Sequence, residues 1–247
     1  MKMVQDYYAA FGFEDYSFRL SLWDPEKTEK YIDQPENWKK SEDRLRQIMD
    51  DLGVDYTESV GEAAFYGPKV DIQFKTALGR EESMSTIQLD FAAKERFGLS
   101  YMDENGNQND EVLVIHRAPL STHERFVAFL TEHWMGNFPT WISPTQVQII
   151  TISERHSDYA GEVASRLKEH KVRVTVDDSD STIGRKIRTH RKMRPAYMLI
   201  IGDGEAADGT VSIRARNGDQ RNGVPLEDFI VGVTEEINNR SSKLSLV

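Results

Sequence analysis

The sequence predicts two domains: an α+β domain over residues 1–141 and an α/β domain over residues 142–247. In the first part, short alternating apolar segments are separated by turn-forming residues, which is typical of antiparallel strands joined by hairpins. In the second part, apolar strands alternate with amphipathic helices, which implies crossover connections on a mixed, mostly parallel sheet of five strands. The pattern changes between Pro139 and Pro144, and we place the domain boundary there.

Periodicity and turn signals define the elements of the first domain. Gly12 is a helix-ending glycine, Asn37 is a favourable N-cap, and the Gly67-Pro68 pair marks a turn. We therefore expect, in order, a helix over residues 3–10, a strand over 16–23, a helix over 37–52, and strands over 70–74 and 85–91.

The stretch from Val112 to Leu130 carries the first candidate site. Its β-branched start predicts a buried strand over residues 112–115, with His116 at the strand end. Ser121 and Glu124 have the spacing of a capping box, so Arg125 is expected in the first turn of a helix. Backbone N–H groups at a helix start already favour an anion, and an arginine fork there suits a phosphate.

The same residues also have a simpler interpretation. A single strand-end histidine is usually a hydrogen-bonded structural residue, and an arginine in a first helical turn is usually solvated. Local pattern alone favours this interpretation.

The second domain repeats strand and helix at a regular pitch. We expect strands over residues 147–152, 172–176, 196–201 and 210–215, with helices over 158–170, 183–193 and 226–239. Such alternation places helices on the faces of the sheet.

Composition indicates a globular chain without a membrane span. Hydrophobic residues make up 38%, and no apolar run approaches the roughly 20 residues that a membrane helix needs. There is no cysteine and no secretory h-region, so a cytoplasmic setting is the default expectation. The net charge of −10 argues against general nucleic-acid affinity, yet six of the ten residues in 185–194 are Lys or Arg. One basic face can still hold a phosphate backbone.

Taken together, several ordered segments resemble threonyl-tRNA synthetase, a class II aminoacyl-tRNA synthetase. They are GEAAFYGPKVDI, STIQLDF, VIHRAPLSTHERF, FPTWISPTQV and the set IGRKIR, AYMLIIGDGE and VSIRAR. The resemblance implies an incomplete antiparallel class II catalytic sheet in residues 1–141 and an anticodon-binding domain in 142–247. It implies a threonine–tRNA ligase that uses ATP and threonine, binds threonine tRNA, and is a homodimer when complete, with no membrane partner.

The resemblance also implies roles for residues of the first domain. Arg125 resembles the arginine of the third class II motif, which holds ATP phosphate. His116 resembles one ligand of an active-site zinc ion, which in that family selects threonine by its hydroxyl. The implied amino-acid and adenylate pocket consists of Tyr66, Lys69, Gln88, Thr122 and Arg125.

In the second domain, the resemblance assigns Glu205, Arg214 and Arg216 to the anticodon site. A carboxylate and guanidinium groups suit the base edges of an unstacked RNA loop. The simpler alternative is that Glu205 and Arg214 pair across a hairpin.

The sequence departs from the family pattern at several positions. Ser121 stands where a glycine is common, and Ser83 where many members have a glutamine that contacts the nucleotide. The resemblance further places the first two class II motifs, and a cysteine and a histidine that complete the zinc site, ahead of this sequence. We therefore expect a C-terminal piece that does not activate threonine alone and binds neither Zn²⁺ nor Mg²⁺ tightly without the complete enzyme.

Two other functions remain open. One is a non-catalytic tRNA-binding or partner-binding protein derived from a class II synthetase, which an open reading frame continuing upstream would argue against. The other is a related synthetase that charges a different amino acid.

Overall fold

The computed structural model describes residues 1–27, 29–76 and 79–247. The chain forms two compact units, Met1–His133 and Trp134–Val247. The structural division therefore comes before the expected boundary at 141/142. Thr140 explains the difference, because its hydroxyl donates to buried Glu236 and so ties the segment before residue 142 to the second unit.

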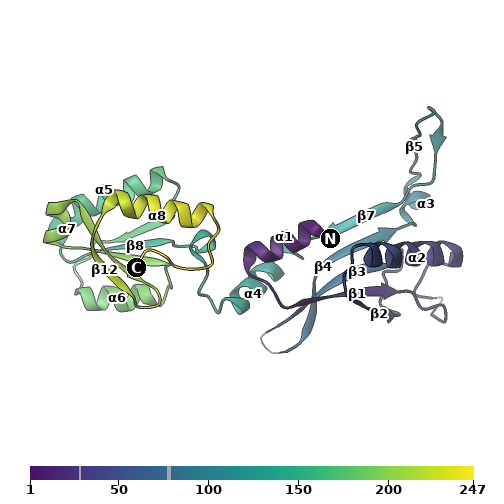
Figure 1. Ribbon diagram of the computed structural model, residues 1–247, viewed down its shortest axis with the longest axis horizontal. Helices are drawn as coiled ribbons and strands as arrows, with labels where there is room; N and C mark the ends of the chain where they lie inside the picture. The colour runs from purple at the N-terminus through teal and green to yellow at the C-terminus, as the bar shows by residue number, and fades with distance from the viewer. Residues whose placement is uncertain (28, 77–78) are drawn as a thin grey trace. The chain divides into compact units, whose positions relative to one another are not determined.

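The first unit is built on a five-stranded sheet in the order β2-β1-β3-β4-β7 (Figure 1). Its strands are β1 (Tyr16–Leu22), β2 (Tyr56–Val60), β3 (Lys69–Lys75), β4 (Glu81–Asp90) and β7 (Val114–Ala118). Its helices are α1 (Lys2–Phe11), α2 (Pro35–Asp51), α3 (Ala93–Phe97) and α4 (His123–His133), and a small separate hairpin joins β5 (Tyr101–Met102) to β6 (Gln108–Asn109).

We expected an antiparallel sheet, but this sheet is mixed. β1 pairs with β2 in parallel, while the β1–β3, β3–β4 and β4–β7 pairs are antiparallel. The reason is α2, which runs between β1 and β2 as a crossover helix and returns the chain in the same direction. The polar strand β2 had no alternating apolar pattern to reveal it.

Alternation along the central strands gives the sheet an apolar and a polar face. Leu20, Val70 and Ile72 are buried and share one face. The helix α2 contributes buried Trp38, which stacks on Trp23 with ring centroids 5.4 Å apart. Residues between the apolar ones are polar, and they form the face that carries the candidate site.

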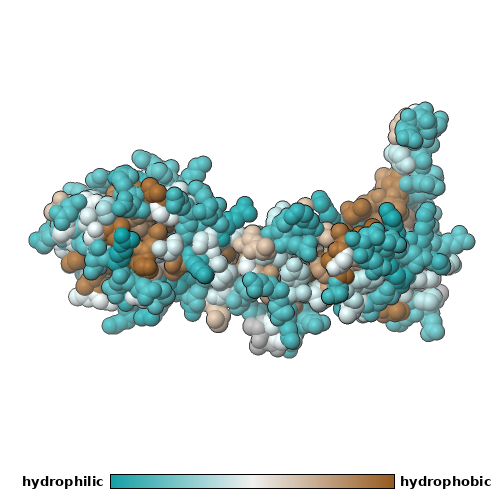
Figure 2. Space-filling model, in the orientation of Figure 1, coloured by the Kyte–Doolittle hydropathy of each residue, from teal (hydrophilic) through white to brown (hydrophobic). Residues whose placement is uncertain are grey.

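The expected burial of the Val112–Ile115 strand is wrong. The strand lies later, at Val114–Ala118, and is the last strand of its sheet among the described residues. Leu113 is 55% exposed and Ile115 is 63% exposed. Figure 2 shows the resulting apolar surface over β7 and the segment before it.

The second unit has a five-stranded sheet in the order β12-β11-β10-β8-β9. Its strands are β8 (Val147–Thr151), β9 (Val174–Asp177), β10 (Tyr197–Ile201), β11 (Thr210–Ala215) and β12 (Gln220–Pro225). Its helices are α5 (Ser157–Glu169), α6 (Ile183–Arg191), α7 (Asp203–Asp208) and α8 (Leu226–Asn238), with short 3-10 turns η1 (Thr140–Ile142) and η2 (Glu154–His156).

The predicted mixed sheet is present, although parallel pairs do not predominate. The pairs β8–β9 and β8–β10 are parallel, whereas β10–β11 and β11–β12 are antiparallel. The helices α5 and α8 cover one face and α6 lies on the other (Figure 1). Side chains of α5 and α8 pack with the sheet in one core that includes Leu167, Leu199 and Phe229.

Candidate functional site

Two of the predicted pocket residues and the predicted zinc ligand form a row across the polar face of the first sheet. Lys69 on β3 lies opposite Gln88 on β4, and Gln88 lies opposite His116 on β7. Opposed residues on neighbouring strands project to the same face. The sheet register therefore brings together Lys69, Gln88 and His116.

Tyr66 joins this row from the turn before β3. Its hydroxyl donates to Oε1 of Gln88, and its ring centroid lies 5.5 Å from that of His116. Burial, followed by the negative charge of Asp90, raises the pKa of Tyr66 above its usual value. The phenol therefore acts as a neutral hydrogen-bond donor in this cluster.

Gly67 lets the Tyr66 turn pass close to β4. A Cβ atom at this position would lie 1.8 Å from the carbonyl oxygen of Leu89. Gly67→Ala is therefore expected to destabilise the first unit by about 3 kcal/mol, because either the turn or β4 must move to relieve the overlap. Urea unfolding of the variant measures this, with Gly79→Ala, which meets no atom within 4 Å, as the control for loss of a turn glycine. Equal midpoints would contradict the expectation.

His116 is held by a buried carboxylate. Its Nε2 lies 2.8 Å from Oδ2 of Asp90, while Oδ1 of Asp90 accepts the backbone N–H groups of Ala92 and Ala93. The His116 side chain is 47% exposed and that of Asp90 is 10% exposed. The histidine is thus both anchored and accessible.

Sequence reasoning missed the charge centre beside this row. Asp71 on β3 is fully buried, and its Oδ2 accepts from Lys69 at 2.7 Å, Ser21 at 2.7 Å and Arg19 at 3.3 Å. Its Oδ1 has no hydrogen-bond partner among the described residues. The carboxylate fixes Lys69 in the row. In the sequence, the only sign of this charge centre was that Asp71 is a charged residue between the alternating apolar residues of a predicted strand.

The predicted capping box at Ser121 and Glu124 is wrong. The helix α4 begins at His123, and its cap is Thr122, whose Oγ1 accepts from the backbone N–H of Arg125 at 3.4 Å. Ser121 instead has φ 59°, a left-handed conformation that favours glycine. This explains physically why a glycine suits that position. Arg125 does lie in the first helical turn, as predicted.

Arg125 and Thr122 are not gathered with the Tyr66 row. The Arg125 guanidinium bonds to the Glu82 carboxylate at 3.1 Å and to the Ser83 carbonyl at 3.4 Å. Glu82 and Gln88 are six positions apart on β4, which is about 20 Å of strand. The candidate site therefore extends along β4, with a guanidinium towards one end and the Tyr66 cluster towards the other.

In the second unit, Glu205 is held at the start of α7. Its Oε2 accepts from the backbone N–H of Gly202 at 3.0 Å, and its Oε1 accepts from Ser212 on β11 at 2.6 Å. Burial raises the pKa of Glu205, but the hydrogen bonds from Ser212 and the backbone outweigh it, so its pKa lies below the usual value. It is a fixed carboxylate near neutral pH.

The two predicted anticodon arginines have different surroundings. Arg216 donates to the carbonyls of Pro195 at 3.2 Å and Phe138 at 2.8 Å, and burial lowers its pKa. Arg214 on β11 forms no side-chain hydrogen bond or ion pair within the described part of the chain, so the alternative pairing of Glu205 with Arg214 is absent there. Arg214 is the freer guanidinium.

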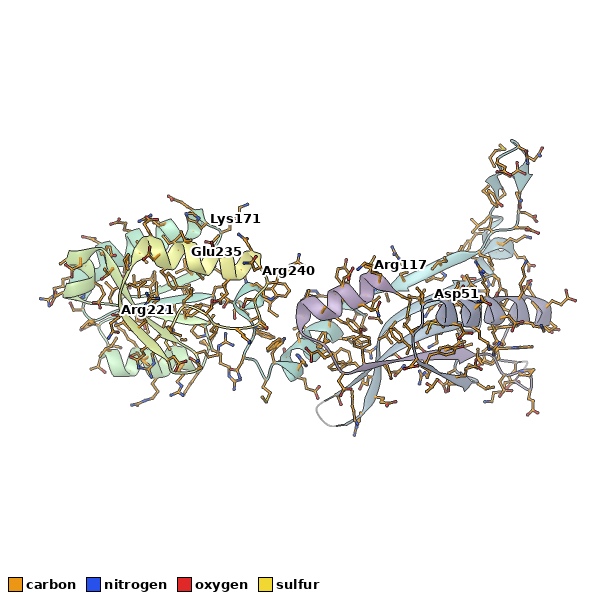
Figure 3. The ribbon with its side chains drawn as sticks, in the orientation of Figure 1. Asp51, Arg117, Lys171, Arg221, Glu235 and Arg240 are labelled. Atoms are coloured by element: carbon orange, nitrogen blue, oxygen red, sulfur yellow. The ribbon has the colours of Figure 1, made fainter. Side chains whose placement is uncertain are left out.

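The basic stretch predicted from the sequence lines an open depression of about 580 Å³. Its lining residues are cationic or polar and comprise Asn137, Arg188, Arg191, Lys192, Arg194 and Arg216. Asn137 was not singled out from sequence, because it precedes the domain boundary expected there. Figure 3 shows that another cation, Arg221, lies on β12.

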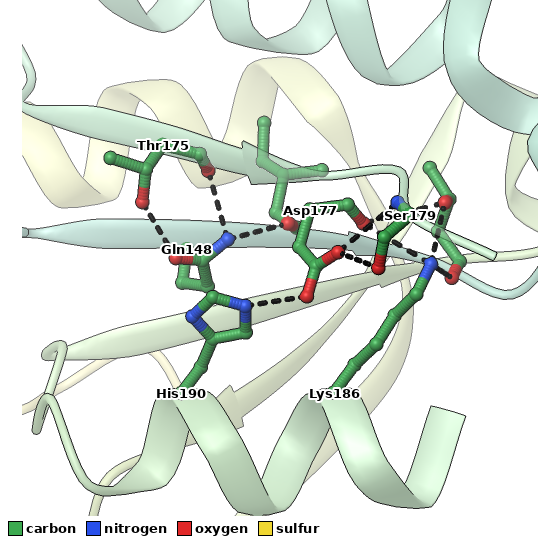
Figure 4. A network of polar contacts seen from close by, with 8 residues as sticks. Gln148, Thr175, Asp177, Ser179, Lys186 and His190 are labelled. Carbon is green, nitrogen blue, oxygen red and sulfur yellow. Dashed lines mark hydrogen bonds and ion pairs between the residues drawn. The ribbon is translucent and has the colours of Figure 1, made fainter. Parts of the chain in front are cut away.

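Polar side chains also gather at the carboxyl ends of β8 and β9 (Figure 4). Nε2 of His190 lies 2.6 Å from Oδ2 of Asp177, while buried Lys186 donates to the carbonyl of Thr151 at 3.0 Å. Burial raises the pKa of Asp177, but bonds from Ser179 and His190 outweigh it and lower the pKa overall. These contacts hold α6, and with it the basic depression, against the sheet.

Within the described ranges, His116 is not joined by further side chains that would complete the implied zinc site. Its donor chemistry suits one ligand position, yet the described residues contain no group of three or more His, Cys, Asp or Glu side chains able to hold a metal ion. Among the described helices, none is long and apolar enough to cross a membrane.

Comparison with known proteins shows which family the chain resembles. Residues 146–236 match the family model described as the anticodon binding domain. The chain is 49% identical over 231 residues to a threonine–tRNA ligase of Bacillus velezensis, covering 93% of this chain and 36% of the relative. It is 47% identical over 238 residues to one of Staphylococcus aureus, covering 96% and 37%. It thus spans about a third of the length of these curated relatives.

Solved structures give the same result. The RNA binding domain of threonyl-tRNA synthetase from Cryptosporidium parvum is similar at 34% identity with a TM-score of 0.85, over 95% of this chain and 58% of that one. A putative threonyl-tRNA synthetase from Aeropyrum pernix is similar at 25% identity with a TM-score of 0.73, over 100% and 62%. A prolyl-tRNA synthetase at 22% identity, with a TM-score of 0.54, shares the fold.

These matches confirm the resemblance to aminoacyl-tRNA synthetases of class II. Within that class, they confirm the particular resemblance to threonyl-tRNA synthetase along nearly the whole chain.

Proposed function

We propose that this chain is the part of a threonine–tRNA ligase that reads the tRNA anticodon and supplies one side of the aminoacylation site. The single observation that carries the proposal is similarity to threonine–tRNA ligases over 93% of the chain, with an anticodon-binding match at residues 146–236. The division into two compact units fits it, with a catalytic part in residues 1–133 and an anticodon-binding part in 134–247. We place the protein in the cytoplasm as a homodimer when complete.

In the proposed reaction, the threonine carboxylate attacks the α-phosphorus of ATP and pyrophosphate leaves. A terminal hydroxyl of threonine tRNA then takes the acyl group and releases AMP. We assign the threonine end to Tyr66, Lys69 and Gln88, and a phosphate to Arg125. The extended arrangement along β4 suits an adenylate, which has an amino acid at one end and a nucleotide at the other. Thr122 supports Arg125 as the helix cap.

His116 is the proposed zinc ligand within this chain, and the bound ion would select the threonine hydroxyl as a Lewis acid. Mg²⁺ would accompany ATP. Tyr66 donates to Gln88 and packs on the His116 ring, so its proposed role is to fix the pocket that receives the amino acid.

In the second unit, we assign base recognition to Glu205, Arg214 and Arg216. Arg214 has the greatest freedom to contact RNA, Glu205 presents a fixed carboxylate, and Arg216 lies at the wall of the basic depression. The depression suits phosphate groups of the RNA backbone, where cations give affinity without sequence information.

Binding of whole tRNA tests this function. The full chain is expected to bind threonine tRNA at least about 10-fold more tightly than valine tRNA, because anticodon contacts typically contribute more than 1 kcal/mol of discrimination. Equal affinity for the two would contradict the assignment.

An alternative is a tRNA-binding protein without catalytic function. The two proposals differ in what they expect of the first unit. The ligase proposal predicts that this unit binds a stable threonyl-adenylate analogue and that Lys69→Met weakens this binding. The row formed by Lys69, Gln88 and His116 favours the ligase, because binding RNA alone does not require it.

A further inference from the structure

The contact between Asp90 and His116 carries an atom-level inference. Asp90 is buried at the end of β4. One carboxylate oxygen, Oδ1, accepts from the backbone N–H groups of Ala92 at 2.8 Å and Ala93 at 2.9 Å, where α3 begins. The other, Oδ2, lies 2.8 Å from Nε2 of His116. Both oxygens of Asp90 thus have defined partners.

This arrangement selects one tautomer of the imidazole. A carboxylate accepts hydrogen bonds, so the contact at Oδ2 requires a proton on Nε2 of His116. A neutral imidazole carries one N–H, and Nδ1 is then the nitrogen with a free lone pair. Within the described part of the chain, Nδ1 of His116 has no hydrogen-bond partner.

The neighbouring contacts hold the ring in place without occupying Nδ1. Tyr66 packs against it with centroids 5.5 Å apart and planes inclined by 59°, and the phenol hydroxyl is directed to Gln88 rather than to the imidazole. The His116 side chain remains 47% exposed. Carboxylate support of one histidine nitrogen, with the other free, is the usual arrangement of a metal-binding histidine.

We propose that Asp90 is a positioning residue that holds His116 as its Nε2–H tautomer, so that Nδ1 is the nitrogen presented to a divalent metal ion. The part of this proposal that concerns the metal ion, called here the metal-binding half, rests on the proposed function. The tautomer itself depends only on the hydrogen bonds around Asp90.

Nitrogen-15 NMR of the histidines in the full chain tests the tautomer directly. The chain has six histidines, and loss of one set of signals in His116→Gln identifies those of His116. At a pH where the imidazole is neutral, two-bond proton–nitrogen correlations are expected to show Nε2 protonated and Nδ1 unprotonated. A protonated Nδ1 in the native chain would overturn the proposal.

Asp90→Asn provides the discriminating variant. An asparagine oxygen can still accept from the backbone N–H groups of Ala92 and Ala93, but its NH₂ group now donates to Nε2, so His116 is expected to switch to the Nδ1–H tautomer. The stacked Trp23–Trp38 pair gives a near-UV circular dichroism signal that reports whether the unit remains folded. If Asp90→Asn unfolds the unit, Asp90→Glu keeps a carboxylate acceptor and is expected to keep the Nε2–H tautomer. An unchanged tautomer in folded Asp90→Asn would overturn the proposal.

Asp177→Asn is the matched control, because Oδ2 of Asp177 contacts Nε2 of His190 at 2.6 Å and its Oδ1 is held by Ser179. It should alter the His190 signals and leave those of His116 unchanged.

Excess Zn²⁺ added to the native chain should shift the nitrogen-15 signal of Nδ1 of His116 more than that of Nε2, and the reverse would overturn the metal-binding half. These readouts are independent of tRNA binding, so failure of the proposed function is seen separately.

Discussion

Asp71→Ala is expected to lower the free energy of unfolding of the first unit by about 4 kcal/mol, because it leaves two partly buried cations without their buried counter-charge. Asp71 is fully buried, whereas the Lys69 and Arg19 side chains are 17% and 28% exposed. All three partners of Asp71 donate to the same oxygen, so the substitution removes the acceptor of all three hydrogen bonds at once.

Urea unfolding followed by near-UV circular dichroism of the Trp23–Trp38 pair measures this effect in the first unit. Asp43→Ala is the matched control, since Asp43 also pairs with two cations, Lys39 and Arg46, but on the exposed surface of α2. Surface ion pairs contribute little to stability. A similar small change in both variants would contradict the role given to Asp71.

Glu236→Ala is expected to lower the free energy of unfolding of the second unit by about 3 kcal/mol, through loss of several buried hydrogen bonds. Glu236 on α8 is 3% exposed. It accepts from the hydroxyls of Thr140 and Tyr197 and from both the backbone N–H and hydroxyl of Ser245. It thereby connects η1, β10 and the C-terminal segment.

The neighbouring Glu235→Ala provides the control, because Figure 3 shows Glu235 on the same helix and its side chain is less buried than that of Glu236. Burial, followed by the hydrogen bond to Glu236, raises the pKa of Tyr197. Glu236→Ala therefore also removes one of the two main causes that raise this pKa. A Glu236→Ala variant with the native unfolding midpoint would contradict this account.

The sequence predicted those elements whose own pattern shows them. β11 was expected at residues 210–215 and is found there, because apolar residues alternate over its whole length. The helix α2 was expected from Asn37 and begins at Pro35, since its buried face repeats at helical spacing. Arg125 was placed in a first helical turn by local signals alone, even though the cap proved to be Thr122.

Features that depend on distant partners could not be predicted in this way. Apolar residues at 112–115 predicted burial, yet Ile115 is exposed because hydrophobicity does not report whether a neighbour covers a strand. The parallel pair of β1 and β2 depends on the path of a crossover helix. Asp71 was missed because an alternating charged residue normally faces solvent, whereas here three side chains from two strands surround it.

Candidate site residues show the same limit. The resemblance indicated Lys69, Gln88 and His116, but their grouping follows from the register of β4 with β3 and β7. The support of His116 by Asp90 likewise depends on a contact between residues 26 positions apart. Local sequence offered only a histidine near a strand end.

Binding of the threonine anticodon stem-loop, with and without altered anticodon bases, tests the central claim most directly. Measured over a salt series, the native chain is expected to prefer the unaltered stem-loop by about 10-fold or more, and Arg214→Ala is expected to lose most of that preference. Arg221→Ala, which removes the same charge from neighbouring β12, should weaken both stem-loops equally and reduce the salt dependence. Equal, steeply salt-dependent binding of both stem-loops by the native chain would contradict anticodon reading.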